Sequence, residues 1–199
     1  MSERPAVGSA EWRAWRRNVD LDDYERRFDR VAAEGGNPHG EVDFVMQFAP
    51  LDALDAGCGF GRVGIELHRR GVEVVGVDLD PDLIERARRR APDLDWRVAD
   101  LAAMDLGRTF SLVVAAGNVI GFVDPARRHE AVRACARHVA VGGHLVMGNQ
   151  LTRGWPTVDE QRGWAADAGL AAVGVFAGWD GAPFADGDYA VVVFTRPRG

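Results

Sequence analysis

The sequence predicts an α/β fold with a doubly wound, mostly parallel sheet of seven strands, preceded by helices. Two observations predict this fold. From about Leu51 onward, short apolar runs alternate with longer amphipathic segments, as in strand–helix–strand units. The apolar runs are also almost continuous, as at residues 74–77 and 112–115, which is expected of strands that helices cover on both faces.

Seven segments have the composition of strands. Five lie near residues 51–56, 73–78, 94–98, 110–115 and 143–148, and two more lie near 171–178 and 189–196. Turn-forming residues at 180–183 and 186–188 link the last two segments, so these can form an antiparallel hairpin. The sheet is therefore expected to be mixed at one edge.

Capping signals mark the expected helices. Asp80 and Asp124 are each followed by proline, which combines an N-cap with proline in the first turn. The second signal opens a helix over residues 126–140, which a Gly-Gly pair is expected to end. Thr157, with glutamate three residues later, forms a capping box for another helix. Ahead of the sheet, helices are expected over residues 10–17, 21–34 and 41–48.

Length and composition are those of one globular domain over residues 1–199. The chain is 47% apolar and 27% charged, as in ordinary folded proteins. No apolar run approaches the roughly 20 residues that a membrane-spanning helix needs. Residues 1–17 do not resemble a secretory signal. We therefore expect a cytoplasmic protein without a membrane partner.

Charge and cysteine content exclude other classes of protein. The net charge is −6, and all 24 basic residues are arginines dispersed among acidic ones, which disfavours a nucleic-acid partner. Cys58 and Cys135 show no metal-ligand spacing with the five histidines, so no metal site is expected. The oligomeric state has no signal in the sequence.

The most informative segment covers residues 51–62, Leu-Asp-Ala-Leu-Asp-Ala-Gly-Cys-Gly-Phe-Gly-Arg. It leads from a strand through a glycine-rich turn into an amphipathic helix. Gly57, Gly59 and Gly61 let the backbone turn sharply and approach a ligand closely, which a β-carbon would obstruct. A tight turn without a ligand is the alternative, and three alternating glycines make it the less favoured one.

Two kinds of ligand, a dinucleotide and S-adenosylmethionine, are the alternatives for this turn. Residues 59–64 match the GxGxxG pattern of dinucleotide-binding proteins, and Asp78 lies at a suitable distance to bind a ribose. However, the expected strand ends at Ala56 and Gly57 follows at once, so the pattern is out of frame. Asp55 at the strand end would also repel a pyrophosphate at the helix N-terminus, where anions normally bind. It favours a cationic ligand such as S-adenosylmethionine, which carries an ammonium and a sulfonium.

Residues 51–62 resemble motif I of the class I S-adenosylmethionine-dependent methyltransferases, an acidic residue followed by GxGxG. The segments at 74–80, 97–101, 110–118 and 139–145 resemble later motifs of this family, in the family's order. The resemblance implies a sheet of order 3-2-1-4-5-7-6 with strand 7 antiparallel, and a donor at the carboxyl ends of the central strands. It also implies a helical lid or cap over residues 1–49 and a Rossmann-like core over residues 50–199.

The resemblance also implies roles for single residues. Asp78 would accept hydrogen bonds from both ribose hydroxyls, Leu79 would pack on the adenine, and Asp100 would accept from the adenine amino group. The residues expected to bind S-adenosylmethionine, and afterwards its product S-adenosylhomocysteine, are Asp55, Ala56, Gly57, Cys58, Gly59, Gly61, Arg62, Asp78, Leu79, Asp100, Leu101, Ala116 and Gly117.

Catalytic candidates are few, because methyl transfer from a sulfonium is an in-line displacement that mainly needs positioning. Asn118 can orient an acceptor, and His39 can reach the site from the lid, although a capping or surface role is equally expected for it. Asn118 is followed by Val-Ile-Gly and not by the Pro-Pro-aromatic sequence of enzymes that methylate nucleic-acid amino groups, which argues against such an acceptor. His129 and His138 are expected to face solvent.

Two groups of aromatic residues remain to be placed. One lies in the C-terminal loops and either stacks on a flat acceptor or covers the sheet edge: Trp155, Trp179 and Phe184. The other lies on the N-terminal helices and is expected to dock them on the core: Trp12, Trp15, Tyr24 and Phe28.

The leading interpretation is a methyltransferase that uses S-adenosylmethionine to methylate a small molecule. An NAD-dependent oxidoreductase is the alternative suggested by GxGxxG, although the chain has no lysine for a Ser/Tyr/Lys proton relay. A non-catalytic S-adenosylmethionine-binding module is a third interpretation, and the motifs do not distinguish it from an enzyme.

Overall fold

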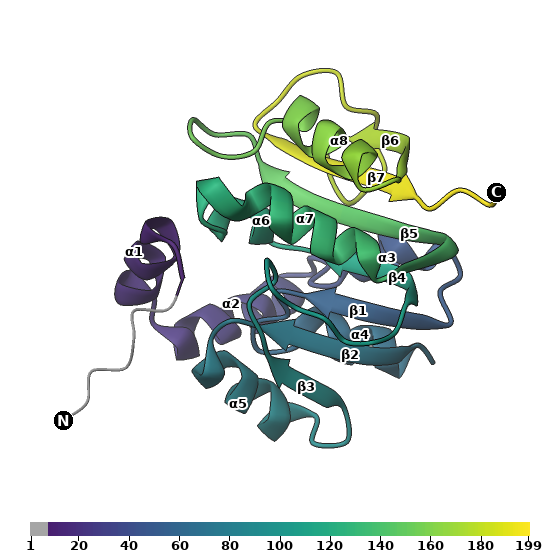
Figure 1. The fold of residues 1–199 in the computed structure, drawn as a ribbon. Helices are drawn as coiled ribbons and strands as arrows, with labels where there is room; N and C mark the ends of the chain where they lie inside the picture. Colours follow the sequence, from purple (N-terminus) through teal and green to yellow (C-terminus); the bar gives the residue numbers. More distant parts are fainter. Residues whose placement is uncertain (1–7) are drawn as a thin grey trace.

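The computed structural model describes residues 8–199, which contain a seven-stranded sheet between two layers of helices (Figure 1). The strands are β1 (Asp52–Ala56), β2 (Glu73–Asp78), β3 (Asp95–Val98), β4 (Phe110–Ala115), β5 (Val139–Gln150), β6 (Ala171–Phe176) and β7 (Tyr189–Thr195). Their order is β3-β2-β1-β4-β5-β7-β6. β1 to β5 pair in parallel, and β7 is antiparallel to both neighbours. The predicted order and the antiparallel seventh strand are confirmed.

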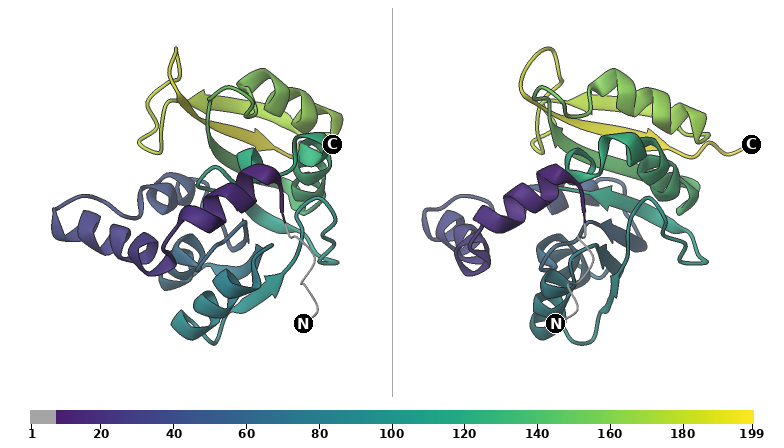
Figure 2. Two further views of the ribbon diagram at one scale, coloured as in Figure 1. Left: turned by 90° about the vertical axis from the view of Figure 1, so that its left-hand side faces the viewer. Right: turned by 60° about the vertical axis from the view of Figure 1, so that its left-hand side comes forward.

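The helices cover both faces of this sheet and one of its ends. They are α1 (Ala10–Asn18), α2 (Leu21–Ala33), α3 (Gly40–Met46), α4 (Arg62–Arg69), α5 (Pro81–Arg90), α6 (Val119–Phe122), α7 (Arg128–Arg137) and α8 (Val158–Asp167), with a 3-10 turn η1 (Pro125–Arg127) before α7. α3, α4 and α5 pack on one face and α6, α7 and α8 on the other. α1 and α2 lie apart from both layers, at one end of the sheet (Figure 2).

The continuous apolar runs follow from this arrangement, because alternate residues of a central strand enter opposite layers. Leu54 of β1 lies in register with Val75 and Val113, and all three pack toward α6, α7 and α8. Ala53 lies in register with Leu112, and both pack toward α3 and α4. The interior positions of these strands are therefore apolar, and polar residues lie near their ends, as at Asp52, Glu73 and Ser111.

The helix predicted over residues 126–140 is wrong in its extent. A 3-10 turn precedes it, α7 ends at Arg137, and β5 already begins at Val139. The reason is strand pairing: the Phe110 amide donates to the His138 carbonyl at 2.7 Å, and Phe110 then pairs with Val139. The glycines at 142 and 143 lie inside β5 beside an irregularity in its register with β4, so they shape a bulge and do not end the helix.

The prediction that His138 faces solvent is also wrong, because only 3% of this residue is exposed. Its Nδ1 lies 2.7 Å from the Ala134 carbonyl oxygen, and its Nε2 accepts a hydrogen bond from the Leu106 amide at 2.9 Å. Since α7 ends here, the ring turns inward and holds the loop that precedes β4.

The predicted capping signals of α5 and α8 are confirmed. The Asp80 carboxylate accepts from the Asp82 amide at the start of α5. The Thr157 hydroxyl accepts from the Glu160 amide, and the Glu160 carboxylate accepts in return from the Thr157 amide. The start of each helix is therefore determined locally.

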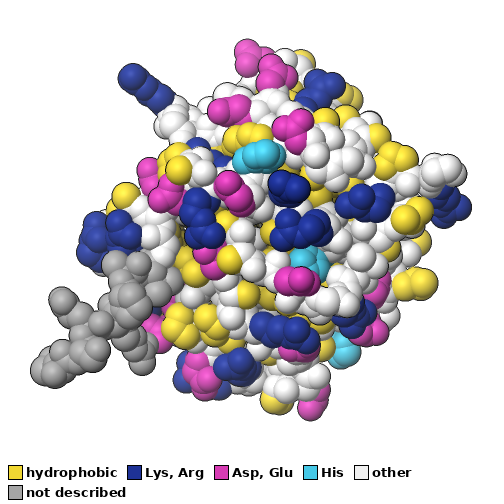
Figure 3. Space-filling view, viewed as in Figure 1, with side chains coloured by type: hydrophobic (Ala, Val, Ile, Leu, Met, Phe, Trp, Pro, Cys, Tyr) yellow, Lys and Arg dark blue, Asp and Glu magenta, His cyan; other side chains and the backbone are white. Residues whose placement is uncertain are grey.

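Acidic and basic side chains are interspersed on the face of the molecule seen in Figure 3. Several of them form ion pairs across elements, such as Arg16 with Asp80 and Arg86 with Asp22. In the part of the chain that the structure describes, no helix is long and apolar enough to cross a membrane.

Candidate functional site

The glycine-rich turn after β1 forms the floor of the candidate site. The amides of Gly57 and Cys58 donate to the Val77 carbonyl at 2.8 and 2.9 Å, which ties the turn to the end of β2. Gly57 has φ of 75°, and a β-carbon there would lie 2.5 Å from a methyl group of Val119. Gly59 has φ of 55° with open space beside it, so glycine is needed for backbone conformation at both positions and for space at Gly57.

A cavity of about 470 Å³ opens above this turn, within the range of about 300–1,000 Å³ typical of small-molecule sites. It lies at the carboxyl ends of β1, β2 and β4, where the order of the strands reverses about β1. Of the thirteen residues predicted to bind the donor, all but two line it, and these eleven are Asp55, Gly57, Cys58, Gly59, Arg62, Asp78, Leu79, Asp100, Leu101, Ala116 and Gly117. Ala56 and Gly61 support the turn from outside the lining.

Asp55 is a buried carboxylate in this cavity, with 2% of the residue exposed. Its Oδ2 accepts a hydrogen bond from the Gly64 amide in the first turn of α4 at 2.8 Å. Burial raises the pKa of the Asp55 carboxyl to about 7, against the opposing effects of the Gly64 hydrogen bond and the nearby Arg62. A cationic ligand beside this carboxyl would favour its charged form.

Asp78 ends β2 on the same side of the cavity. Its two oxygens accept hydrogen bonds from the amides of Gly59 and Asp80, at 2.8 and 2.9 Å. Burial raises the pKa of the Asp78 carboxyl to about 6 even so. Within residues 8–199 neither Asp78 nor Asp55 is in a salt bridge, and the nearby Arg62 pairs with Glu41 instead.

Asp100 and Leu101 lie in the loop after β3. The Asp100 carboxylate accepts from the Ala102 amide at 2.9 Å and forms an ion pair with Arg127. Leu101 is buried and lines the cavity next to it. The Asp100 side chain is 36% exposed and lines the cavity, so a ligand there can reach its carboxylate.

Arg62 has a structural task besides lining the cavity. Its guanidinium pairs with Glu41 and donates to the Pro38 carbonyl, and it lies 4.2 Å from the centre of the Phe28 ring. These contacts join the start of α4 to α2 and α3. Arg62 therefore fastens the N-terminal helices to the glycine-rich turn.

The two catalytic candidates lie outside the cavity lining. The Asn118 side-chain oxygen accepts from the Gln150 amide at 2.7 Å, and Asn118 takes φ of 70° at the start of α6. The Nε2 atom of His39 lies 3.9 Å from a Glu66 carboxylate oxygen. Both side chains thus have structural contacts, and their catalytic roles stay predictions.

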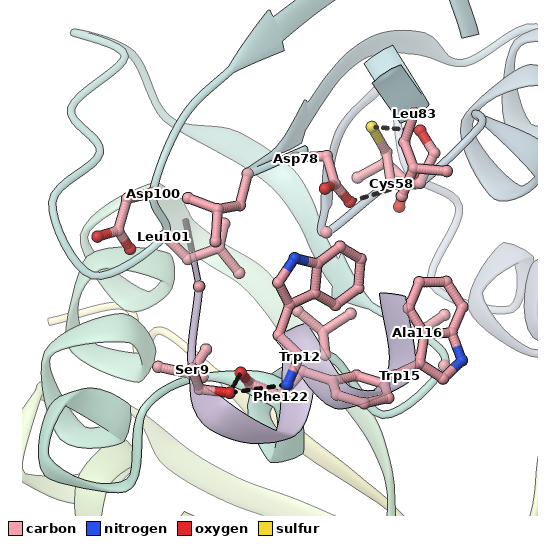
Figure 4. A pocket seen from close by; sticks show the side chains of 18 of the residues that line it. Ser9, Trp12, Trp15, Cys58, Asp78, Leu83, Asp100, Leu101, Ala116 and Phe122 are labelled. Carbon is pink, nitrogen blue, oxygen red and sulfur yellow. Dashed lines mark hydrogen bonds between the residues drawn. The ribbon is translucent and has the colours of Figure 1, made fainter. Parts of the chain in front are cut away.

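The structure adds residues that sequence reasoning did not assign to the site. Most come from α1, α2, α6 and the segments beside them, and they are Gly8, Ser9, Trp12, Trp15, Tyr24, Val119, Phe122, Val123, Asp124 and Arg127. The glycine-rich turn, α4 and α5 add Phe60, Val63 and Leu83. Figure 4 shows Trp12 and Trp15 projecting from α1 on the side where Asp78 and Ala116 lie. The signal in the sequence was the pair of tryptophans three residues apart, which places both on one face of a helix.

The aromatic residues of the C-terminal loops cover other elements. Trp155 packs edge-on against Phe122 at 5.2 Å, and the Trp179 indole donates to the Tyr189 hydroxyl at 2.9 Å. The cavity lining includes none of Trp155, Trp179 and Phe184. Of these three residues, Trp179 packs beside β7, and Trp155 packs on α6.

The residues of the cavity fit S-adenosylmethionine. Two buried acidic groups suit a cationic ligand, and open space at Gly59 and Gly117 lets such a ligand approach the backbone. Among residues 8–199, no group of three or more His, Cys, Asp or Glu side chains is arranged to hold a metal ion.

Comparisons with known proteins agree with this fit. Residues 53–143 match a family model described as a methyltransferase domain. A solved structure of a TehB-like SAM-dependent methyltransferase from Corynebacterium glutamicum is 37% identical, with a TM-score of 0.80, and the match covers 88% of this chain and 97% of that one.

Two curated relatives are similar over part of their length. A magnesium-protoporphyrin O-methyltransferase of Rhodobacter capsulatus is 34% identical over 57% of this chain and 54% of its own length. A ubiquinone biosynthesis O-methyltransferase of Alkalilimnicola ehrlichii is 34% identical over 66% of this chain and 60% of its own length. The matches thus span little more than half the length of these relatives.

Proposed function

Because the chain belongs to the class I S-adenosylmethionine-dependent methyltransferases, we propose that it methylates a small molecule by direct in-line transfer. The donor of this family is S-adenosylmethionine, and family membership decides against the NAD alternative. The curated relatives are named for magnesium-protoporphyrin and for ubiquinone biosynthesis, which supports a small-molecule acceptor. The proposal depends on one observation: two buried carboxyls that form no salt bridge with the described residues, Asp55 and Asp78, line one cavity at the carboxyl ends of the strands.

In this proposal the donor lies across the eleven predicted residues that line the cavity. Asp78 accepts from the ribose hydroxyls, Leu79 and Leu101 enclose the adenine, and Asp100 accepts from its amino group. Asp55 stabilises the positive charge, and Ala116 and Gly117 face the methionine part. When bound, S-adenosylmethionine supplies a methyl group that is already activated by its sulfonium.

The reaction itself then needs positioning in a dry cavity. With the donor bound, the acceptor's nucleophilic atom would form a bond to the methyl carbon as the carbon–sulfur bond breaks. The neutral thioether of S-adenosylhomocysteine would leave, and the acceptor's proton would pass to the solvent outside the cavity. Holding the reacting atoms collinear at about 3–3.5 Å is the main contribution that the protein makes. Burial raises the pKa of the Cys58 thiol well above its ordinary value, so the neutral thiol acts as packing in the turn.

We also propose that the chain forms one domain in which the N-terminal segment predicted over residues 1–49, of which residues 1–7 lie outside the described part, acts as a lid over the core of residues 50–199. No residue of α1 is buried, yet its tryptophans line the cavity. α1 is attached through polar contacts, since Ser9 donates to the Phe122 carbonyl at 2.7 Å and Arg16 pairs with Asp80 and Asp82, and through ring contacts of its tryptophans with Phe122. Contacts of this kind can open without disrupting the core.

Calorimetry with S-adenosylhomocysteine tests the proposed donor site. Asp78→Asn keeps the shape of the side chain but removes its charge and one acceptor, and it should weaken binding about 10- to 100-fold because charged hydrogen bonds contribute about 1.5–3 kcal/mol. Asp93→Asn, an exposed residue outside the cavity, is the matched control and should bind as the wild type does. Unchanged binding by Asp78→Asn would refute the assignment.

Turnover distinguishes an enzyme from a non-catalytic module. The protein, incubated with S-adenosylmethionine and extracts of small metabolites, should produce an acceptor that gains the mass of one methyl group. Binding of the donor with no acceptor methylated in any extract would favour the non-catalytic module.

A further inference from the structure

The proposed donor residues account for one side of the cavity only. They lie at the carboxyl ends of β1, β2 and β4 and in the loop after β3. The opposite side belongs to α1, α2, α6 and the segments beside them, and its residues are Gly8, Ser9, Trp12, Trp15, Tyr24, Val119, Phe122, Val123, Asp124 and Arg127. Its two charged side chains already have partners, because Asp124 accepts from the Ala126 amide and Arg127 pairs with Asp100. This second side is available for contacts that the donor does not use.

Four of these residues form a continuous aromatic wall, defined here as Trp12, Trp15, Tyr24 and Phe122. The Trp12 and Trp15 rings are stacked with centroids 4.8 Å apart, and Phe122 lies 5.7 and 5.8 Å from them. The Tyr24 ring meets Trp15 edge-on at 5.5 Å. Trp15 contacts the other three rings and is the centre of the wall.

The wall offers few polar groups. The Ser9 hydroxyl is already used, because it donates to the Phe122 carbonyl and accepts from the Trp12 amide. Within residues 8–199, the indole N–H groups of Trp12 and Trp15 and the Tyr24 hydroxyl have no hydrogen-bond partner in the protein. Burial raises the pKa of the Tyr24 hydroxyl, so this group stays neutral and can donate.

We propose that the aromatic wall binds the methyl acceptor and that this acceptor is a planar, uncharged aromatic molecule stacked against Trp15. The proposal rests on the methyltransferase function proposed above. Stacking on tryptophan stabilises the binding of a flat aromatic ring. The two indole N–H groups and the Tyr24 hydroxyl are enough to form hydrogen bonds with one or two heteroatoms of such a ring. A sugar is disfavoured, because most of its hydroxyls would be buried against these rings without partners.

Matched pairs of ligands test this class of acceptor. The protein is saturated with S-adenosylhomocysteine, and each ligand is titrated into it separately by calorimetry. The affinity for catechol is compared with that for cis-cyclohexane-1,2-diol, and the affinity for benzenethiol with that for cyclohexanethiol. Each planar ring should bind at least about tenfold more tightly than its saturated partner, since stacking on an aromatic side chain contributes on this scale. The saturated ring is at least as apolar, so a preference for the planar ring reports stacking and not hydrophobicity.

Trp15→Leu tests the wall itself. This variant should lose the preference for planar rings to within about twofold, while its affinity for S-adenosylhomocysteine stays within about threefold of the wild type. Trp155→Leu is the matched control, because Trp155 packs on the same Phe122 at 5.2 Å but does not line the cavity, and this variant should keep both affinities.

Two results would overturn the proposal. One is equal binding of the planar and saturated rings by the wild type. The other is a loss of S-adenosylhomocysteine affinity in Trp15→Leu as large as the loss for catechol, which would assign the wall to the donor. Failure of the wild type to bind S-adenosylhomocysteine at all would refute the proposed function instead, so the two failures are distinguishable.

Discussion

Asp55 and Asp78 are single residues that form the site but lower the stability of the fold when they are charged. Both carboxyls are buried at the ends of neighbouring parallel strands, and burial raises the pKa of Asp55 to about 7 and that of Asp78 to about 6. Each accepts backbone hydrogen bonds that hold the glycine-rich turn and α4 in place. Buried carboxyls that have raised pKa values and form no salt bridge are typical of a ligand site.

The stability of the ligand-free protein should depend on pH through Asp55. A carboxyl with a folded-state pKa of about 7 and an ordinary value of 3.8 is protonated more readily in the folded state. It therefore stabilises the fold below pH 3.8, and this contribution is lost as the pH rises to about 7. Relative to Asp55→Asn, the wild type should lose roughly 3 kcal/mol of unfolding free energy across this window. Urea titrations at several pH values measure it, and a constant difference between the two proteins would contradict the prediction.

Helices at the two ends of the chain differ in what holds them. α8 begins at a complete capping box and packs on the sheet through Ala165. α1 also has a capped start, at Ser9, but buries no residue and depends on side-chain contacts to α5 and α6. α8 therefore belongs to the core, whereas α1 has the properties expected of a lid.

Loss of the Arg16 contact should act on ligand exchange more than on stability. Arg16→Gln removes the pair with the exposed Asp82, which contributes about 0–1 kcal/mol, and the pair with the buried Asp80, which keeps its hydrogen bond from the Asp82 amide. We expect S-adenosylhomocysteine to dissociate about threefold faster, as followed by stopped-flow tryptophan fluorescence. Arg30→Gln is the control, because its partner Asp23 lies on α2 itself. Equal dissociation rates in both variants would argue against α1 as a lid.

The capping box of α8 should contribute to stability alone. Thr157→Ala removes the acceptor for the Glu160 amide and should lower the free energy of unfolding by about 1 kcal/mol, measured in urea. Binding of S-adenosylhomocysteine should stay unchanged, because α8 lies outside the cavity lining. Thr152→Ala in the preceding loop serves as the comparison, and a Thr157 variant as stable as the wild type would disprove the role of the cap.

At the scale of the whole molecule, the reversal of strand order about β1 decides where a ligand binds. β2 and β4 lie on either side of β1, and their connections run over opposite faces of the sheet. The loops that follow these strands separate at their carboxyl ends and leave the cavity between them. α1 and α2 lie at one end of the sheet (Figure 2), and their side chains line the cavity opposite the strand ends.

Donor binding should stabilise the whole protein. S-adenosylhomocysteine at 100 times its dissociation constant adds about 2.7 kcal/mol, which corresponds to roughly 5–10 °C in Tm for a chain of this size. NAD at the same concentration should leave Tm unchanged, since the acidic groups Asp55 and Asp78 oppose a pyrophosphate. Differential scanning fluorimetry measures both ligands, and stabilisation by NAD alone would reverse the assignment of the ligand.

Local signals in the sequence were sufficient for most elements of the core. The five apolar parallel strands, the hairpin edge and the caps of α5 and α8 depend on residues close together in the chain, and the structure agrees with them. Strand order came from the resemblance to a family. Where a local signal competed with strand pairing, as at the end of α7, the longer-range interaction determined the boundary.

The donor side of the cavity could be predicted from sequence because it consists of strand ends and the turns that follow them. The local geometry of parallel strands places Asp55, the glycines after it and Asp78. Their spacing along the chain is therefore enough to predict a ligand site at these strand ends. The aromatic wall could not be predicted in this way. Trp12 and Trp15 reach the cavity only because α1 packs against Phe122, more than 100 residues away in the chain, through the contact of Ser9 with its carbonyl. The position of a helix that is attached by side-chain contacts alone depends on the surface on which it docks, and only the tertiary structure determines that surface.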